Sequence, residues 1–171
     1  MARTASKLLN IELSGEFIGL GIRKQRRVMI AVHYGAGKLW DKEYLGMHFR
    51  LGAGRRYSYQ HRTAKTKRRK EQLAARGKVK KGGRVDLVHS GLLEESMTRQ
   101  HVIRAYPTRV VVNMPTTSYV SSRPRGNRPN MAAEITRVIP SEIARIADES
   151  ARILERETKK ESVDNRRKIK V

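Results

Sequence analysis

The chain has 171 residues, which suits one domain with a core of its own and is too few for two domains of typical size. It holds 38 Lys and Arg against 16 Asp and Glu, a net charge of +22, so we expect a polyanionic partner, either nucleic acid or an acidic protein surface. The lack of cysteine excludes disulfides and thiolate metal sites, and no apolar run approaches the ~20 residues that span a bilayer, so we expect no membrane partner.

The N-terminal part of the chain contains one strand pattern and one helix pattern. Leu9, Ile11 and Leu13 alternate with polar residues, which predicts a short strand at the edge of a sheet. From residue 20 to residue 49 apolar residues recur at steps of three and four, which predicts one long helix. Three glycines weaken this helix by roughly 1 kcal/mol each, so we expect a bend, or close packing against another backbone. These are Gly35, Gly37 and Gly46.

A basic arm, residues 55–84, follows the helix. Its basic residues are Arg55, Arg56, Arg62, Lys65, Lys67, Arg68, Arg69, Lys70, Arg76, Lys78, Lys80, Lys81 and Arg84, against the single acid Glu71. So much like charge repels itself, and we expect a long loop or arm with a helical turn over residues 64–75. Tyr57 and Tyr59 are its only interleaved aromatics, and we favour their packing the base of the arm onto the domain over their stacking on bases.

Short elements follow the arm. Residues 92–97 predict a short helical turn. The β-type segments 101–105 and 109–114, the second rich in valine, predict a hairpin. Residues 133–139 suggest one more strand or an extended segment.

The C-terminal part of the chain begins with a second loop over residues 121–130, which carries Arg123, Arg125 and Arg128. Beyond Pro140, apolar residues at helical spacing face a row of charged residues, which predicts an amphipathic helix. The stripe is lost at Lys159, and we expect a basic tail from there on.

These elements predict an α+β fold: a small, mostly antiparallel sheet packed by a long N-terminal helix and a C-terminal amphipathic helix, with a long basic arm and loops. We expect four parts of one domain. Residues 1–54 hold the N-terminal strand and the long helix, residues 55–84 the basic arm, residues 85–158 the sheet and the C-terminal helix, and residues 159–171 the basic tail.

No pattern in the sequence predicts a catalytic or metal site. The five histidines, His33, His48, His61, His89 and His101, are too widely spaced for a local ligand pair. His89 and Ser90 are adjacent, and adjacent side chains rarely align for proton transfer. The segment 35–38 lacks the first glycine and the Ser or Thr of a phosphate loop. We therefore expect no enzyme, no catalytic residues, no metal and no cofactor.

The basic arm has two interpretations. Each Lys or Arg that neutralises a phosphate releases a counterion, so the arm could bind nucleic acid tightly and without regard to sequence. The alternative is an arm that stays in solvent or docks on a protein, and the composition does not favour one over the other.

The order of the parts, with one short block of residues, resembles a known family. The block consists of Leu87, Val88, Ser90, Gly91, Leu92 and Ser96. It lies between the basic arm and the valine-rich hairpin, as in the tail-completion, or head-tail joining, proteins of tailed bacteriophages, which the chain resembles over roughly residues 20–154.

The resemblance implies an α+β subunit that forms a homo-oligomeric ring at the neck of the virion, assembled in the host cytoplasm. The adjoining partners would be the portal or adaptor on the capsid side and the tail proteins, with double-stranded DNA as a candidate partner inside the ring. The resemblance does not explain so basic an arm, whose polyanion is either this DNA or the acidic face of a neighbour. The rival interpretation is a ribosomal-type RNA-binding protein with basic extensions.

Overall fold

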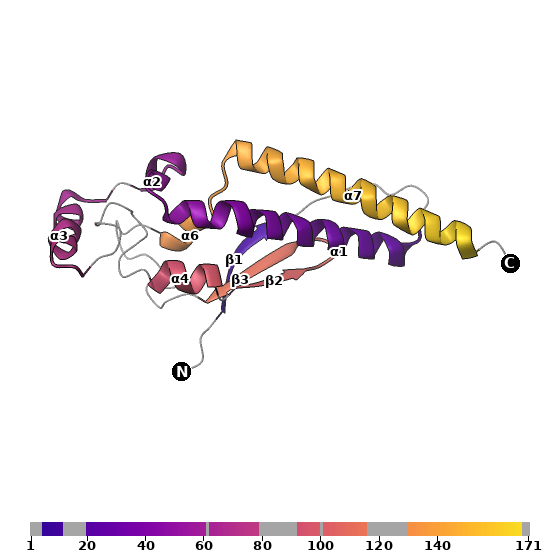
Figure 1. Cartoon of the computed structure of the whole chain (residues 1–171), viewed down its shortest axis with the longest axis horizontal. Helices are drawn as coiled ribbons and strands as arrows, with labels where there is room; N and C mark the ends of the chain where they lie inside the picture. The colour runs from indigo at the N-terminus through magenta and orange to yellow at the C-terminus, as the bar shows by residue number, and fades with distance from the viewer. Residues whose placement is uncertain are drawn as a thin grey trace.

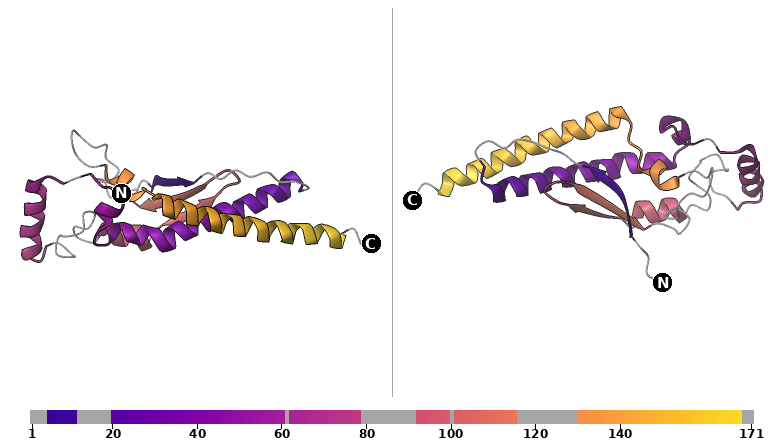
Figure 2. Two further views of the ribbon diagram at one scale, coloured as in Figure 1. Left: turned by 90° about the horizontal axis from the view of Figure 1, so that it is seen from above. Right: turned by 180° about the vertical axis from the view of Figure 1, so that it is seen from behind.

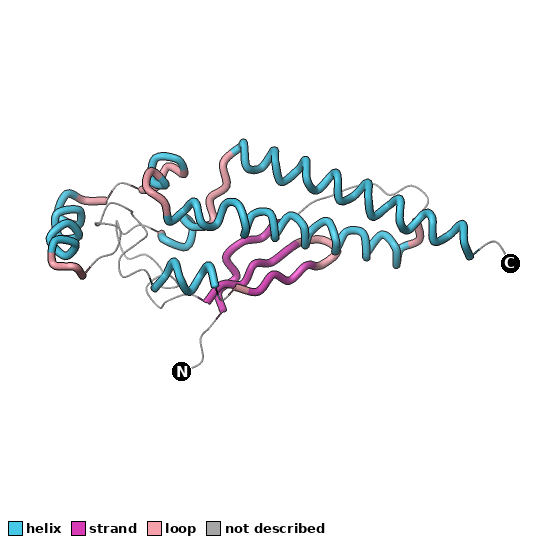
Figure 3. Tube along the Cα trace, viewed as in Figure 1, coloured by secondary structure: helices cyan, strands magenta, loops and turns pink. Residues whose placement is uncertain are grey.

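A computed structural model describes residues 5–11, 20–60, 62–78, 92–99, 101–115 and 130–168, and the fold is α+β (Figures 1 and 3). The strands are β1 (Ala5–Ile11), β2 (Val102–Ala105) and β3 (Val110–Pro115). The helices are α1 (Ile22–Leu39), the π-helix η1 (Trp40–Tyr44), the 3-10 helix η2 (Leu45–Phe49), α2 (Ala53–Arg56), α3 (Ala64–Ala75), α4 (Leu92–Arg99), α6 (Met131–Ile135) and α7 (Pro140–Lys168).

The sheet has three antiparallel strands in the order β1-β3-β2. β2 and β3 form the predicted hairpin, which the backbone N–H of Tyr106 closes by donating to the Arg109 carbonyl at 2.7 Å. β1 pairs with β3 at the edge of the sheet, as the alternation of Leu9 and Ile11 predicts. The valines of β3 supply the inner surface, because Val110 and Val112 are fully buried.

The molecule has three layers, with α1 between the sheet and α7 (Figures 1 and 2). α1 and α7 run antiparallel. Lys24 of α1 pairs with Glu161 near the end of α7, and Glu43 of η1, which continues α1, pairs with Arg145 near the start of α7. The expected α+β fold is confirmed, and within it α7 packs mainly on α1.

Two glycines of α1 explain why α7 and the sheet both come so close to this helix. A Cβ on Gly35 would lie 2.1 Å from the Cδ1 atom of Ile153 in α7, and a Cβ on Gly37 would lie 2.7 Å from a methyl of Val110 in the sheet. Because the two positions are about 200° apart around the helix, they face different layers. Gly35 and Gly37 are therefore closely packed, but against side chains and not against another backbone as expected, and a Cβ on Gly46 would have no neighbour within 4 Å.

The helix predicted over residues 20–49 is confirmed as helical structure from Ile22 to Phe49, but its type changes at Trp40. The π and 3-10 turns keep four large side chains in the main core: Trp40, Tyr44, Leu45 and Phe49 are all at most 8% exposed. The predicted helical turns over 64–75 and 92–97 are confirmed as α3 and α4.

Two further expectations differ from the structure. The strand suggested over residues 133–139 is wrong, because Met131–Ile135 forms α6, whose first turn is capped by the Asn130 side chain accepting from the Ala133 N–H at 3.0 Å. α7 also continues beyond residue 158 to Lys168. Ion pairs replace the apolar stripe there, with Lys159 bound to Glu155 at 2.6 Å and Glu161 bound to Lys24 at 3.4 Å.

Candidate functional site

The helix of the basic arm, α3, stands apart from the three layers, at the opposite end of the molecule from the C-terminal end of α7 (Figure 1). No residue of α3 is buried. The Thr63 hydroxyl caps the helix by accepting from the Thr66 N–H at 3.3 Å, and Gly77, with a φ of +68°, follows its last turn. Neighbouring residues therefore set both ends of α3, and the helix buries no residue in the core.

Basic side chains cover α3. They are Lys65, Lys67, Arg68, Arg69 and Lys70, and Arg76 is the C-cap residue. Lys65, Arg68, Arg69 and Arg76 are exposed, and none of these four makes an ion pair with a residue that the structure describes. This part of the arm therefore presents cations to solvent.

The segment just before α3 behaves differently. We call residues 53–60 together with Arg62 the arm root. Tyr57 and Tyr59 are 2% and 8% exposed, which confirms that they pack the base of the arm onto the domain. Two buried carboxylates from the C-terminal part of the chain, Glu134 and Glu142, hold the arm root in place.

Glu142 lies in the first turn of α7 and is 1% exposed. One carboxylate oxygen accepts from Nη2 of Arg56 at 3.0 Å and from the Tyr57 hydroxyl at 2.8 Å. The other accepts from the Ile139 N–H at 3.4 Å, the contact by which a Glu three residues into a helix closes a capping box. Glu142 thus joins the start of α7 to the arm root.

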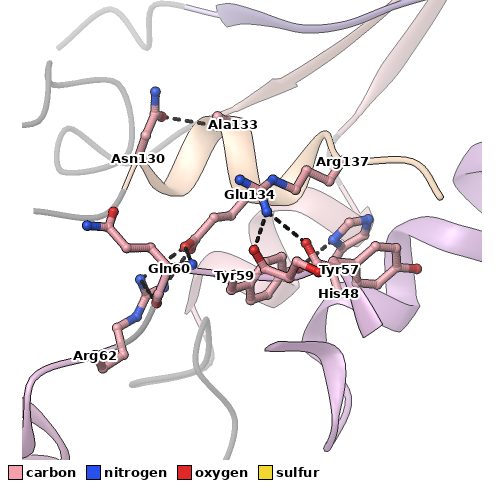
Figure 4. Close-up of polar contacts among 10 residues, drawn as sticks. His48, Tyr57, Tyr59, Gln60, Arg62, Asn130, Ala133, Glu134 and Arg137 are labelled. Atoms are coloured by element: carbon pink, nitrogen blue, oxygen red, sulfur yellow. Dashed lines mark hydrogen bonds and ion pairs between the residues drawn. The ribbon is translucent and has the colours of Figure 1, made fainter. Parts of the chain in front are cut away.

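Glu134 of α6 forms an ion pair with the second basic residue of the arm root, Arg62 (Figure 4). The guanidinium of Arg62 donates to both carboxylate oxygens, from Nη2 at 2.5 Å and from Nη1 at 3.1 Å, and the Gln60 N–H adds a third bond at 3.0 Å. The side chains of Arg62 and Glu134 are 11% and 3% exposed. A two-pronged pair this well shielded from water is fixed in geometry, and losing either partner leaves a buried charge.

The turn between these contacts is strained, and it is held by Arg137, which follows α6. Ser58 has a φ of +50°, in the left-handed region that a residue with a side chain rarely adopts. The Arg137 side chain donates to the carbonyl oxygens of Tyr57, at 2.9 Å, and of Ser58 (Figure 4). Both carbonyls at the strained turn therefore have a charged donor.

An aromatic stack completes the arm root. The rings of His48 and Tyr57 lie 3.9 Å apart and within 14° of parallel, and Nδ1 of His48 shares a 2.5 Å hydrogen bond with the Tyr59 hydroxyl. Burial, helped by the cation of Arg56, lowers the pKa of His48 to about 4, so its ring is neutral at neutral pH. Burial, together with the Glu142 carboxylate, raises the pKa of the Tyr57 phenol.

The thirteen basic residues predicted as one arm therefore divide into groups. Arg56 and Arg62 are tied to acids in the arm root, and Arg55 is exposed beside them. The residues on and just after α3 are Lys65, Lys67, Arg68, Arg69, Lys70, Arg76 and Lys78. Lys80, Lys81 and Arg84 lie outside the described residues.

The other predicted site residues are mostly outside the described part of the chain. This holds for Leu87, Val88, Ser90 and Gly91 of the family block, and for Arg123, Arg125 and Arg128 of the second loop. Leu92 and Ser96 are described, at the start and in the middle of α4.

Sequence reasoning missed the residues that hold the arm root. A signal exists for Glu142, because a Glu two residues after a helix-starting proline suits the capping position that it occupies. Nothing near Glu134 or Arg137 marks them, since the residues that they contact lie at least 72 positions away.

The chain matches no family model, no curated protein and no solved structure. Among the described residues, no three His, Asp or Glu side chains gather in a way that could hold a metal ion. None of the described helices combines the length and the apolar character needed to cross a membrane.

Proposed function

We propose that this chain is a structural virion protein that forms a ring at the phage neck, where it joins the portal side of the DNA-filled capsid to the tail. The observation that carries the proposal is a set of large apolar side chains that the two long helices leave exposed. Ile22, Ile30 and Tyr34 of α1 are 70%, 39% and 44% exposed, and Ile143 of α7 is 56% exposed. Such side chains on a chain with so modest a core favour contacts with other subunits.

The positions of these side chains suit a ring. Ile30 and Tyr34 are four residues apart on one side of α1, and Ile30 lies two turns before Gly37, on the side of the helix whose later turns meet the sheet. The exposed Ile143 lies on a different helix. When two different patches on one subunit complement each other, the contact is heterologous and can repeat until a ring closes.

Two other features support this function. The order of a long helix, a basic arm, the block from Leu87 to Ser96, a hairpin and a final helix resembles head-tail joining proteins. The arm root also mounts α3 away from the layers, where it can reach a neighbouring ring or the DNA. We propose a non-enzymatic role, with the portal or adaptor and the tail proteins as neighbours, in the virion neck after assembly in the host cytoplasm.

Mass photometry and negative-stain imaging of the purified protein test the ring. We expect closed rings, which Ile30→Glu and Ile143→Glu should each shift to monomers by placing a charge in the contact. Leu51→Glu is the matched control, because Leu51 is 71% exposed but lies in a turn outside the long helices. A protein that stays monomeric at all concentrations and sediments with ribosomal RNA would overturn the proposal in favour of the ribosomal-type alternative.

A further inference from the structure

We infer that one face of α3 binds the sugar-phosphate backbone of double-stranded DNA. The face consists of Lys65, Arg68, Arg69, Gln72 and Arg76. Their spacing of three, four, seven and eleven residues from Lys65 places them on one side of a helix with 3.6 residues per turn. That the duplex is DNA rests on the proposed function, whereas the choice of a duplex backbone follows from the helix itself.

The cations of this face are available and held in place. Lys65, Arg68, Arg69 and Arg76 are exposed and make no ion pair with any described residue. The capped start of α3 comes directly after Arg62, which the buried Glu134 fixes to the domain. Because the helix is already formed and Arg62, two residues before it, is anchored, binding orders little of the chain, which lowers its entropic cost.

An acidic protein surface fits this face less well than phosphates do. Protein interfaces gain most of their affinity from apolar and aromatic side chains that become buried at the centre of the contact. The face has no such residue, and no residue of α3 is buried against the domain either. Charge without an apolar centre suits a polyanion whose phosphates stay partly in water.

A single-stranded nucleic acid also fits poorly. Single strands are held largely by bases that stack on aromatic side chains, and α3 contains no aromatic residue. Tyr57 and Tyr59, the nearest aromatics in sequence, are 2% and 8% exposed and stack with His48 inside the domain. Contacts to the phosphates of a duplex carry no sequence information, so binding through them does not depend on base sequence.

The length of the face sets the size of the expected effect. From Lys65 to Arg76 the helix rises about 16 Å, roughly half a turn of duplex DNA. Four cations that each neutralise one phosphate contribute about 3.6 to the slope of log affinity against log salt concentration. Removing the four charges of the face should therefore reduce this slope by a defined amount.

The test compares two variants of the full chain that each lose four charges. The face variant carries Lys65→Gln, Arg68→Gln, Arg69→Gln and Arg76→Gln. The control variant carries Arg23→Gln, Lys42→Gln, Arg50→Gln and Arg104→Gln, at exposed positions spread over the domain that make no ion pair with described residues. Glutamine keeps most of the helix propensity of Lys and Arg, and circular dichroism checks that both variants fold.

Fluorescence anisotropy of labelled duplexes with two unrelated sequences, over about 50 to 250 mM salt, measures the affinity. We expect the face variant to lose about 3 units of salt slope and roughly 100-fold in affinity at low salt, and the control to lose less than one unit. Equal losses in the two variants would overturn the inference. So would tighter binding of single-stranded DNA or duplex RNA, or displacement of the duplex by polyglutamate at equal charge concentration.

Imaging of the same samples separates the two proposals. Rings whose affinity for duplex DNA is untouched in the face variant would overturn the DNA contact and leave the ring intact. Loss of duplex binding in a protein that never forms rings would support the face and count against the proposed neck ring.

Discussion

The arm root and α3 belong to one basic stretch of sequence and contain the same types of basic residue, but they differ in whether those residues are paired with acids. Arg62 is 11% exposed and grips a buried carboxylate with both prongs of its guanidinium. Arg69, seven residues later, is exposed and has no acid partner among the described residues. Charge density alone therefore does not predict whether an arginine forms a structural ion pair or stays exposed to solvent. That outcome depends on where acidic residues distant in sequence lie in the fold.

Matched substitutions at Arg62 and Arg69 test this difference most strongly, because we expect very different losses in the free energy of unfolding. Arg62→Met leaves Glu134 buried with little beyond the Gln60 N–H, so we expect the free energy of unfolding to fall by about 3 kcal/mol. Arg69→Met should change it by less than about 0.5 kcal/mol, because α3 buries nothing. Urea denaturation followed by circular dichroism measures both. Similar losses in the two variants would show that α3 has contacts of its own with the domain.

A drop in pH should loosen the arm root while leaving the charges of α3 unchanged. The pKa of His48 is lowered to about 4, so between about pH 6.5 and about pH 4 the unfolded chain binds a proton that the native protein does not. The stabilisation is complete above about pH 6.5 and is lost as the pH falls toward 4. We expect the free energy of unfolding to decrease by about 2 kcal/mol between about pH 7 and about pH 5 from this group.

The variant His48→Phe isolates this contribution, because phenylalanine keeps an aromatic ring in the stack and has nothing to protonate. Its free energy of unfolding should depend less on pH than that of the natural chain, by the same amount. Identical pH profiles for the two proteins would mean that His48 is already protonated, or exposed, in the native state.

The smallest effect on overall stability should come from the cap of α3. Thr63→Ala removes the hydroxyl that accepts from the Thr66 N–H, a contact worth about 1 kcal/mol to the helix. We expect the amides of α3 to exchange about 5-fold faster with solvent deuterium, while urea unfolding of the whole chain stays within about 0.5 kcal/mol. A large loss of global stability would contradict the separation of α3 from the arm root.

Much of the fold could be predicted because its signals are local. The capped, polar segment of α3, the valine-rich hairpin and the apolar stripe of α7 each follow from neighbouring residues. The layer order could not, since it depends on Gly35 and Gly37 meeting the side chains of Ile153 and Val110, which are distant in sequence. The apolar stripe predicts too early an end for α7, because its last turns are joined by ion pairs and not by apolar contacts.

The site was predictable as a composition and not as a geometry. The sequence identifies the basic arm, and it favours the packing of Tyr57 and Tyr59 that the structure confirms. It does not distinguish Arg56 and Arg62 from the other cations, because their carboxylate partners are 86 and 72 residues away. These ion pairs form only when the chain folds, so no local sequence pattern predicts them.

The same separation orders events during synthesis. When Arg62 is added to the growing chain, 72 residues remain to be added up to Glu134, a delay of about 4 to 14 s at roughly 5 to 20 residues per second. Once Arg84 has been added, the complete basic arm is present, and the acids that fasten its root are missing until Glu134 is made. A translation product that ends between Arg84 and Glu134 would therefore carry the whole polycation and neither of its two retaining carboxylates.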